Sequence, residues 1–149
     1  MKNIIIAVLV FLLSFTTFHR ISGSAIIKGD SMLPSLKNNE MVSVNKIANP
    51  VHGDIVIFID PETKDLSIKR VIATEGQTIG FKRGDVYVNG KKLNEYYLSK
   101  DMQTFTYSKC DTRVCGKDEF FVMGDNRTNS TDSRIYGTIS LKDIVGILY

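Results

Sequence analysis

The sequence predicts a mainly β domain with antiparallel pairing, and three observations favour this fold class. Apolar residues alternate with polar ones or form short runs of about four to eight residues, as β-strands do. Turn-forming residues separate these runs, and Asn89-Gly90 is the strongest local hairpin signal. Beyond residue 24 no amphipathic pattern is long enough for more than a few helical turns. We therefore expect one antiparallel β domain with short connections.

The first strands are predicted by two different patterns. Met41–Ile47 alternates, with Val42 and Val44 on one face, as expected for a half-buried strand. Ile55–Ile59 is continuously apolar, which indicates a central strand buried on both faces. Leu66–Ala73 follows as a further strand.

The remaining elements follow from turn signals and from further apolar runs. Asn89-Gly90 lies within 85–93, so this segment predicts a hairpin. Two more strands are expected over Glu119–Met123 and Thr138–Leu148, the latter with a helical portion at Ser140–Ile144. Residues 94–117 are polar and lack periodicity, so we expect a short excursion from the core there.

The amino-terminal segment differs from the rest of the chain. Ile4–Phe18 is uncharged and mostly aliphatic, which is compatible with a transmembrane anchor, a cleaved signal peptide or a buried helix. Small residues at Ser22 and Ser24 are spaced as a processing site requires, and they support the cleaved alternative. We favour an uncleaved signal-anchor over residues 1–24, followed by a β domain over 25–149. The flanking positive charges are nearly balanced and do not decide orientation.

Length and composition exclude several classes of protein. A chain of 149 residues with 43% hydrophobic and 23% charged residues is expected to form one globular domain. The net charge of +3 is mild, and basic residues cluster only in pairs, so nucleic acid is not an expected partner. Two cysteines and two scattered histidines do not form a metal-ligand cluster. Cys110 and Cys115 either form a small disulfide hairpin or remain free thiols.

Ser31 and Lys69 are the candidate catalytic pair. Gly29 removes a side chain near Ser31, and Pro34 fixes the backbone just beyond it. Lys69 lies inside an apolar strand beside Arg70, and two adjacent cations cannot both be solvated on one face. Arginine stays charged in any environment, whereas a desolvated lysine loses its proton readily. A neutral Lys69 amine could therefore take the proton of Ser31.

Histidine is a poorer candidate for the base. His19 adjoins the apolar segment and His52 precedes a strand, and neither lies in a recognisable catalytic motif. A dense polar loop, Gly124–Arg134, instead follows a predicted strand and is typical of a segment that holds side chains in fixed places.

Three segments together resemble the three sequence boxes of bacterial type I signal peptidases, the membrane-bound Ser/Lys proteases of the S26 family. They are Gly29–Leu36, Ile68–Ile72 and Gly124–Arg134, and they occur in the family order. Gly53–Phe58 matches a fourth, structural box. The resemblance spans roughly 29–137 and the predicted anchor, and it implies the antiparallel signal-peptidase/LexA-like fold with one transmembrane helix.

The resemblance also implies roles for individual residues. Ser31 is the expected nucleophile and Lys69 the general base, with the Ser130 hydroxyl orienting the lysine amine. Gly29 stands where some members carry an oxyanion-binding serine, so the oxyanion would rest on backbone N–H groups, including that of Ser31. The implied supporting residues are Asp125, Asp132 and Arg134, and the implied substrate-binding residues are Ile27, Met32 and Ile68.

The function implied is removal of signal peptides from exported preproteins without a cofactor. Substrates would carry small residues such as alanine before the cleaved bond. The chain would sit in the lipid bilayer of the bacterial cytoplasmic membrane, with its catalytic domain on the extracytoplasmic side. Alternatives are a TraF-type peptidase of a conjugation system, a LexA-like self-cleaving regulator, and a membrane-tethered binding domain without catalysis. The apolar segment and the polar loop oppose the LexA-like alternative, and Ser31 with Lys69 opposes the non-catalytic one.

Overall fold

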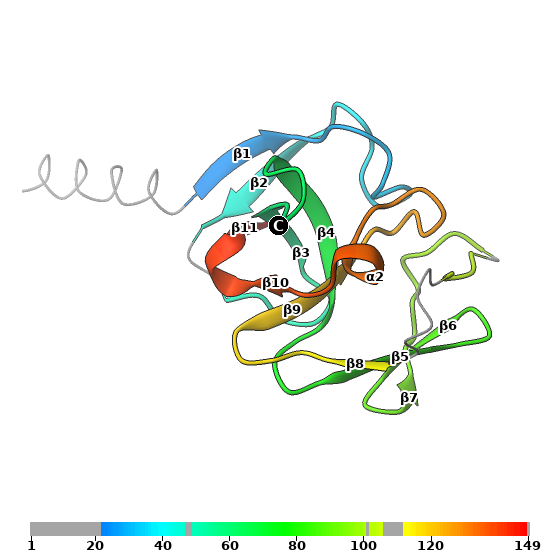
Figure 1. Cartoon of the computed structure of the whole chain (residues 1–149). Helices are drawn as coiled ribbons and strands as arrows, with labels where there is room; N and C mark the ends of the chain where they lie inside the picture. The colour runs from blue at the N-terminus through cyan, green and yellow to red at the C-terminus, as the bar shows by residue number, and fades with distance from the viewer. Residues whose placement is uncertain (1–21, 47–48, 101, 106–111, 149) are drawn as a thin grey trace, which may run out of the picture.

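The computed structural model describes residues 22–46, 49–100, 102–105 and 112–148, which form two antiparallel sheets (Figure 1). A seven-stranded sheet has the order β1-β2-β11-β3-β4-β9-β10, and a four-stranded sheet has the order β7-β6-β5-β8. The predicted mainly antiparallel β fold is therefore confirmed. The strands are β1 (Ser22–Ile26), β2 (Met41–Asn45), β3 (Ile55–Ile59), β4 (Leu66–Ala73), β5 (Thr78–Lys82), β6 (Asp85–Val88), β7 (Lys91–Lys92), β8 (Thr112–Val114), β9 (Glu119–Met123), β10 (Ile139–Ser140) and β11 (Ile144–Leu148).

Most of the predicted strands form where their patterns indicate. β3 buries Val56, Ile57 and Phe58, as expected for a central strand. The predicted hairpin joins β6 to β7, and both turn residues, Asn89 and Gly90, adopt the positive φ that this tight turn requires. The carboxy-terminal segment splits into β10, a short 3₁₀ helix η1 (Leu141–Asp143) and β11, so the helical portion is confirmed.

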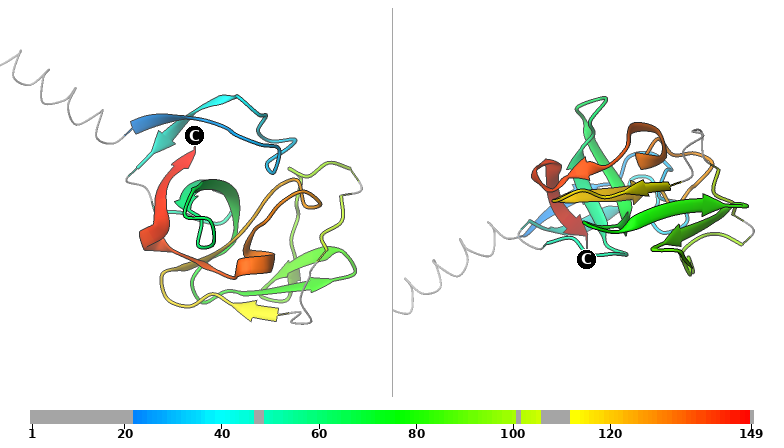
Figure 2. Two further views of the ribbon diagram at one scale, coloured as in Figure 1. Left: turned by 45° about the horizontal axis from the view of Figure 1, so that its top comes forward. Right: turned by 60° about the horizontal axis from the view of Figure 1, so that its bottom comes forward.

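Strand β4 connects two hydrophobic clusters because successive side chains point to opposite faces. Val71 packs in one cluster with Val56 and Phe58 of β3. Ile72 packs in a second cluster, which extends to Ile79 of β5 and so ties the small sheet to the large one. Both views in Figure 2 show the small sheet to one side of the curved large sheet. Lys69 and Arg70 precede these two residues on the same strand and therefore lie on opposite faces.

The predicted excursion over 94–117 contributes a strand to the small sheet. β8 pairs with β5, and Gly80 lies opposite Thr112 in the register. Cys115 is a buried free cysteine, whereas Cys110 lies outside the described residues. Residues 1–21 of the predicted anchor also lie outside the described residues, and Ser22–Ser24 belong to β1. Among the residues described, no helix is long and apolar enough to cross a membrane.

Candidate active site

Ser31 lies in the turn that follows β1, and the polar loop holds this turn in place. The Ser31 carbonyl oxygen accepts a hydrogen bond from the backbone N–H of Asn126 at 2.9 Å. The Asn126 side chain donates to the Asp30 carbonyl at 3.1 Å. Gly29 adopts φ +85°, which favours glycine at this position. Two contacts from Asn126 thus fix the peptide groups before and after the Ser31 α-carbon.

Lys69 reaches Ser31 from the middle of β4. Its Nζ lies 3.1 Å from Ser31 Oγ, although the two residues are 38 positions apart in sequence. Lys69 Nζ also donates to the Ile68 carbonyl at 2.9 Å. The residue is only 5% exposed, and Val56 lies opposite it on β3. The structure therefore brings together the predicted nucleophile and the predicted base.

The surroundings of Lys69 favour its neutral form. Burial lowers the pKa of Lys69 because an ammonium loses hydration there, while the charges of Asp132 and Asp60 act in the opposite direction. In the described part of the chain, its hydrogen-bond partners are a hydroxyl and a carbonyl, with no carboxylate in direct contact. A neutral amine at hydrogen-bond distance from a serine hydroxyl is the arrangement that proton abstraction requires.

Asp132 is the centre of the hydrogen-bond network in the polar loop. Its carboxylate accepts two guanidinium hydrogen bonds from Arg134, each at 2.8 Å, and both side chains of this ion pair are fully buried. It also accepts from the Ser130 hydroxyl at 2.8 Å and from the Gly124 N–H at 3.0 Å. Because every oxygen is engaged, the carboxylate fixes the loop rather than contacting Lys69 directly.

Gly124 and Ser130 are packed closely beneath Ser31. A Cβ on Gly124 would lie 2.6 Å from the Ser31 carbonyl oxygen and would also strike the Ser130 side chain, so only glycine fits. Ser130 lines the same cavity as Ser31 and Lys69. Its hydroxyl donates a hydrogen bond to Asp132. Orientation of the Lys69 amine by Ser130 therefore stays a prediction.

Asp125 pairs with Arg70, a residue that the sequence analysis did not assign to the site. Arg70 donates two hydrogen bonds to the Asp125 carboxylate, at 2.9 and 2.7 Å, and a third to the Gly53 carbonyl at 2.8 Å. Its guanidinium carbon also lies 4.1 Å from the ring centre of Tyr97. Both adjacent cations of β4 are thus buried, one on each face of the strand.

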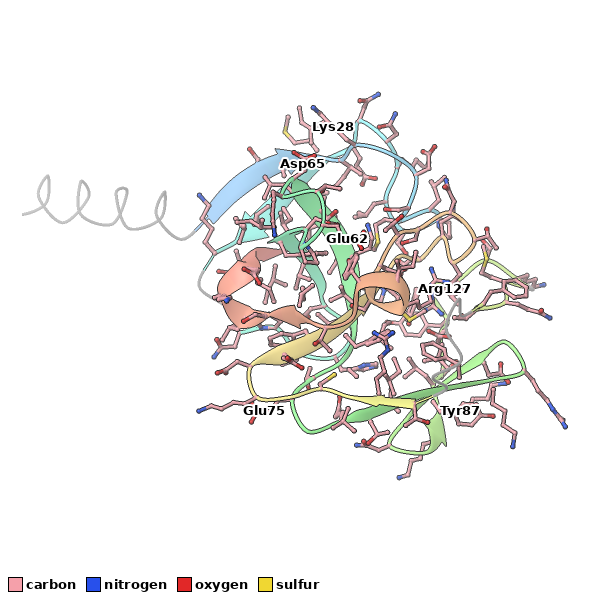
Figure 3. The ribbon with its side chains drawn as sticks, in the orientation of Figure 1. Lys28, Glu62, Asp65, Glu75, Tyr87 and Arg127 are labelled. Atoms are coloured by element: carbon pink, nitrogen blue, oxygen red, sulfur yellow. The ribbon has the colours of Figure 1, made fainter. Side chains whose placement is uncertain are left out.

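Arg127 was also missed, and it links the polar loop to the segment before β8. It is 1% exposed, donates to the Gly124 carbonyl at 3.0 Å, and forms an ion pair with Glu95. Its guanidinium lies on the side of the loop that faces the small sheet (Figure 3). Tyr97 donates to Glu95 at 2.9 Å. The only sequence signal for Arg127 was its place in the polar loop, and nothing indicated Glu95 as its partner.

The three predicted substrate-binding residues lie together. Ile27, Met32 and Ile68 line a groove of about 760 Å³ between β1 and the first half of β4, and Ser31 and Lys69 line the same groove. Ile27 and Met32 are only 2% exposed and contribute apolar surface to it. Lys28 and Asp65, both labelled in Figure 3, contribute polar groups to the two walls.

A second cavity adjoins the same two residues and was not predicted. It has a volume of about 540 Å³ and shares Gly29, Ser31, Ser67 and Lys69 with the groove. It also includes Asp60, which is 4% exposed and accepts a hydrogen bond from Ser67 at 3.3 Å. His52, by contrast, hydrogen-bonds to the Ile72 carbonyl at 2.8 Å and lines neither cavity.

Comparisons with known proteins point to one family. The family model described as signal peptidase, peptidase S26, matches residues 1–148. Signal peptidase I P of Bacillus subtilis subsp. natto is 40% identical over 160 aligned positions, covering 98% of this chain and 83% of that protein. Signal peptidase I T of Bacillus subtilis (strain 168) is 39% identical, covering 97% and 79%. The crystal structure of a signal peptidase I from Enterococcus faecalis is similar with a TM-score of 0.60 and 28% identity, covering 69% of this chain and 99% of that one.

Proposed function

This chain belongs to the signal peptidase family, peptidase S26, and from that premise we propose that it cleaves signal peptides from exported preproteins with Ser31 as nucleophile and Lys69 as general base. The observation that carries this mechanism is the 3.1 Å separation of Ser31 Oγ and Lys69 Nζ in a buried setting. The family membership supports a serine peptidase, and the geometry supports these two residues as its reacting groups.

The proposed reaction proceeds through an acyl-enzyme. The neutral Lys69 amine takes the Ser31 proton while Oγ attacks the substrate carbonyl, and the tetrahedral oxyanion rests on backbone N–H groups, including that of Ser31. The carbonyl–nitrogen bond then breaks, and the leaving nitrogen receives the proton from Lys69. A water activated by the same amine hydrolyses the ester. Asp125, Asp132, Arg134 and Ser130 act by holding the loop against Ser31.

The groove supports recognition of an extended peptide. β1 is at the edge of the large sheet, and β9 pairs with β4 only from Arg70 onward, which leaves one edge of Leu66–Lys69 unpaired in the sheet register. A substrate strand between these two edges would satisfy backbone groups on both sides. Ile27, Met32 and Ile68 would then form shallow apolar walls suited to small side chains such as alanine.

Membrane attachment is part of the proposal. We propose that the apolar amino-terminal segment is retained as a single signal-anchor in the bacterial cytoplasmic membrane, with the β domain on the extracytoplasmic side. The short sequence distance from this segment to Ser31 supports cleavage close to the bilayer, where the hydrophobic part of a signal peptide resides. Mass measurement of membrane-extracted protein tests retention of residues 1–24.

The mechanism is tested with full-length protein in detergent and a preprotein carrying an Ala-x-Ala site. Wild type is expected to cleave after the second alanine, and both Ser31→Ala and Lys69→Ala are expected to abolish cleavage. Equal cleavage by wild type and Lys69→Ala would remove lysine as the base. Failure of the wild-type protein to cleave any preprotein would favour a binding domain instead. Preference for a single pilin or transfer protein over general preproteins would indicate the conjugation-associated branch.

A further inference from the structure

The polar cavity and the apolar groove meet at the candidate catalytic pair. Both include Gly29, Ser31, Ser67 and Lys69, so a peptide lying across Ser31 has room on either side of it. The groove continues along mostly apolar residues, among them Ala25 and Ile26 of β1 and Leu66 and Ile68 of β4. The cavity continues along polar residues only, which are Asp30, Asp60, Thr63, Asn129, Ser130 and Thr131.

We propose that the polar cavity binds the residues that follow the scissile bond, and that Asp60 makes it prefer a basic residue there. This inference rests on the proposed function, because it says where the same site binds the part of the substrate that follows the cleaved bond. A substrate strand in the groove carries its small residues up to Ser31. The chain beyond the cleaved bond must therefore leave on the opposite side, where the polar cavity lies.

Asp60 is a buried carboxylate whose two oxygens accept hydrogen bonds from neutral groups, the Ser67 hydroxyl on one and the backbone of its own turn on the other. One oxygen accepts the backbone N–H groups of Glu62 and Thr63, at 2.9 and 3.1 Å, and closes the turn between β3 and β4. An asparagine oxygen would serve this turn equally well. The negative charge, moreover, opposes the neutral state of Lys69, because it raises the pKa of that amine. A charge that disfavours the base needs another role.

The amine that leaves in the reaction gives the Asp60 charge such a role. When the bond between the carbonyl carbon and nitrogen breaks, Lys69 delivers the Ser31 proton to that nitrogen and a new amino terminus forms in the cavity. An α-amino group has an ordinary pKa of about 7.7–8.0, so it then takes a second proton from water and becomes a cation near neutral pH. A nearby carboxylate in a partly desolvated site attracts this cation and also any basic side chain close to it.

The test uses three preproteins that share one signal peptide and differ only in the first residue after the cleaved bond. That residue is lysine, glutamine or glutamate. For wild type, kcat/KM is expected to fall from lysine to glutamine to glutamate, with about a tenfold span for a charge in a partly screened site. The rate of acyl-enzyme hydrolysis is expected to be equal for all three preproteins, because the residue in which they differ has already left with the product.

Two variants identify Asp60 as the cause. Asp60→Asn keeps an oxygen for the turn and removes the charge, and it is expected to reduce the span to within about twofold. Glu62→Gln removes an exposed charge from the same hairpin, at a residue that does not line the cavity, and it is expected to keep the full span. Urea unfolding of both variants checks that the fold is retained.

Two outcomes would overturn the inference. Cleavage of all three preproteins at equal kcat/KM by wild type would show that the cavity does not sense the charge. An undiminished preference in Asp60→Asn would show that another group does so. Either result leaves the proposed function intact. No cleavage of any preprotein by wild type would instead reject the proposed function, and this inference would fall with it.

Discussion

Lys69 and Arg70 are neighbours on β4 and are similarly buried, at 5% and 9% exposure, yet their surroundings are opposite. Lys69 meets a hydroxyl and a backbone carbonyl, and burial lowers its pKa. Arg70 meets the Asp125 carboxylate through two hydrogen bonds and the face of Tyr97. The contacting partner, more than the degree of burial, therefore decides whether a cation on this strand is held in its charged form.

Arginine–carboxylate pairs like that of Arg70 with Asp125 recur around the polar loop. Arg134 pairs with Asp132 and Arg127 pairs with Glu95, so each of these guanidinium groups has a contacting carboxylate. Arginine keeps its charge in such sites and holds its partner in a fixed fork. Within the residues that the structure describes, the loop thus rests on paired charges, while the amine beside Ser31 has no carboxylate in contact.

Removing the amine gives the largest expected effect. Lys69→Met should lower kcat/KM by about 10²–10⁴-fold, because a positioned general base is lost. The same change should raise the free energy of unfolding, by about 1 kcal/mol, because a desolvated amine is replaced by an apolar side chain of similar length. Preprotein cleavage and urea unfolding measure the two effects.

A matched variant separates charge from proton abstraction. Lys69→Arg keeps a cation but cannot lose its proton, so it should be as inactive as Lys69→Met. Substantial activity in Lys69→Arg would contradict the contrast between the two faces of β4.

Breaking a structural pair should cost stability. Asp125→Ala leaves Arg70 buried without its carboxylate, and we expect a loss of about 3–5 kcal/mol in the free energy of unfolding. The control is Asp85→Ala, which removes the carboxylate from an exposed pair with Lys92, whose side chains are 40% and 61% exposed. That control should lose far less stability, because solvent screens an exposed pair. Similar losses in both variants would show that Arg70 does not depend on its partner.

A smaller effect is expected on the pH dependence of cleavage. Asp60 raises the pKa of Lys69, so Asp60→Asn should lower that pKa further. A base with a lower pKa stays neutral to lower pH, and the acidic limb of kcat/KM should therefore move to lower pH in this variant. Glu62→Gln is the control and should leave the limb unchanged. Movement of the limb to higher pH would show that Asp60 acts on Lys69 in another way.

The smallest effect is expected at a buried hydroxyl near these charges. Tyr136, in α2 (Ser133–Tyr136), packs against the cluster of Val56 and Phe58, and its hydroxyl has no hydrogen-bond partner in the described residues. Burial and the nearby charge of Asp132 raise the pKa of this phenol. Tyr136→Phe removes an unsatisfied polar atom and should change the free energy of unfolding by less than about 1 kcal/mol, in the stabilising direction. A loss above 2 kcal/mol, on the scale of an unmade buried hydrogen bond, would mean that the hydroxyl has a partner.

Most strands could be predicted from the sequence because their signals are local, whereas the choice of Ser31 and Lys69 as the candidate pair depended on the family resemblance. The apolar run of β3, the Asn89-Gly90 turn and a lysine inside an apolar strand are each visible within a few residues. The resemblance named Asp132 and Arg134 as supporting residues, and the structure adds that these two side chains form a buried ion pair.

The missed contacts are those that depend on topology. Arg70 and Asp125 are 55 positions apart, and Arg127 and Glu95 are 32 apart, so only the completed sheets bring them together. β1 was missed because its small polar residues carry no strand period and follow the apolar segment directly. Asp60 was missed because a carboxylate before Pro61 is typical of a turn, which it also forms.

The most direct test is the pH dependence of kcat/KM for preprotein cleavage by the full-length enzyme. The acidic limb reports the base of the free enzyme, and burial of Lys69 predicts an apparent pKa clearly below the ordinary lysine value of about 10.4. A limb close to that ordinary value, or an unchanged profile in Lys69→Met, would contradict a neutral amine beside Ser31.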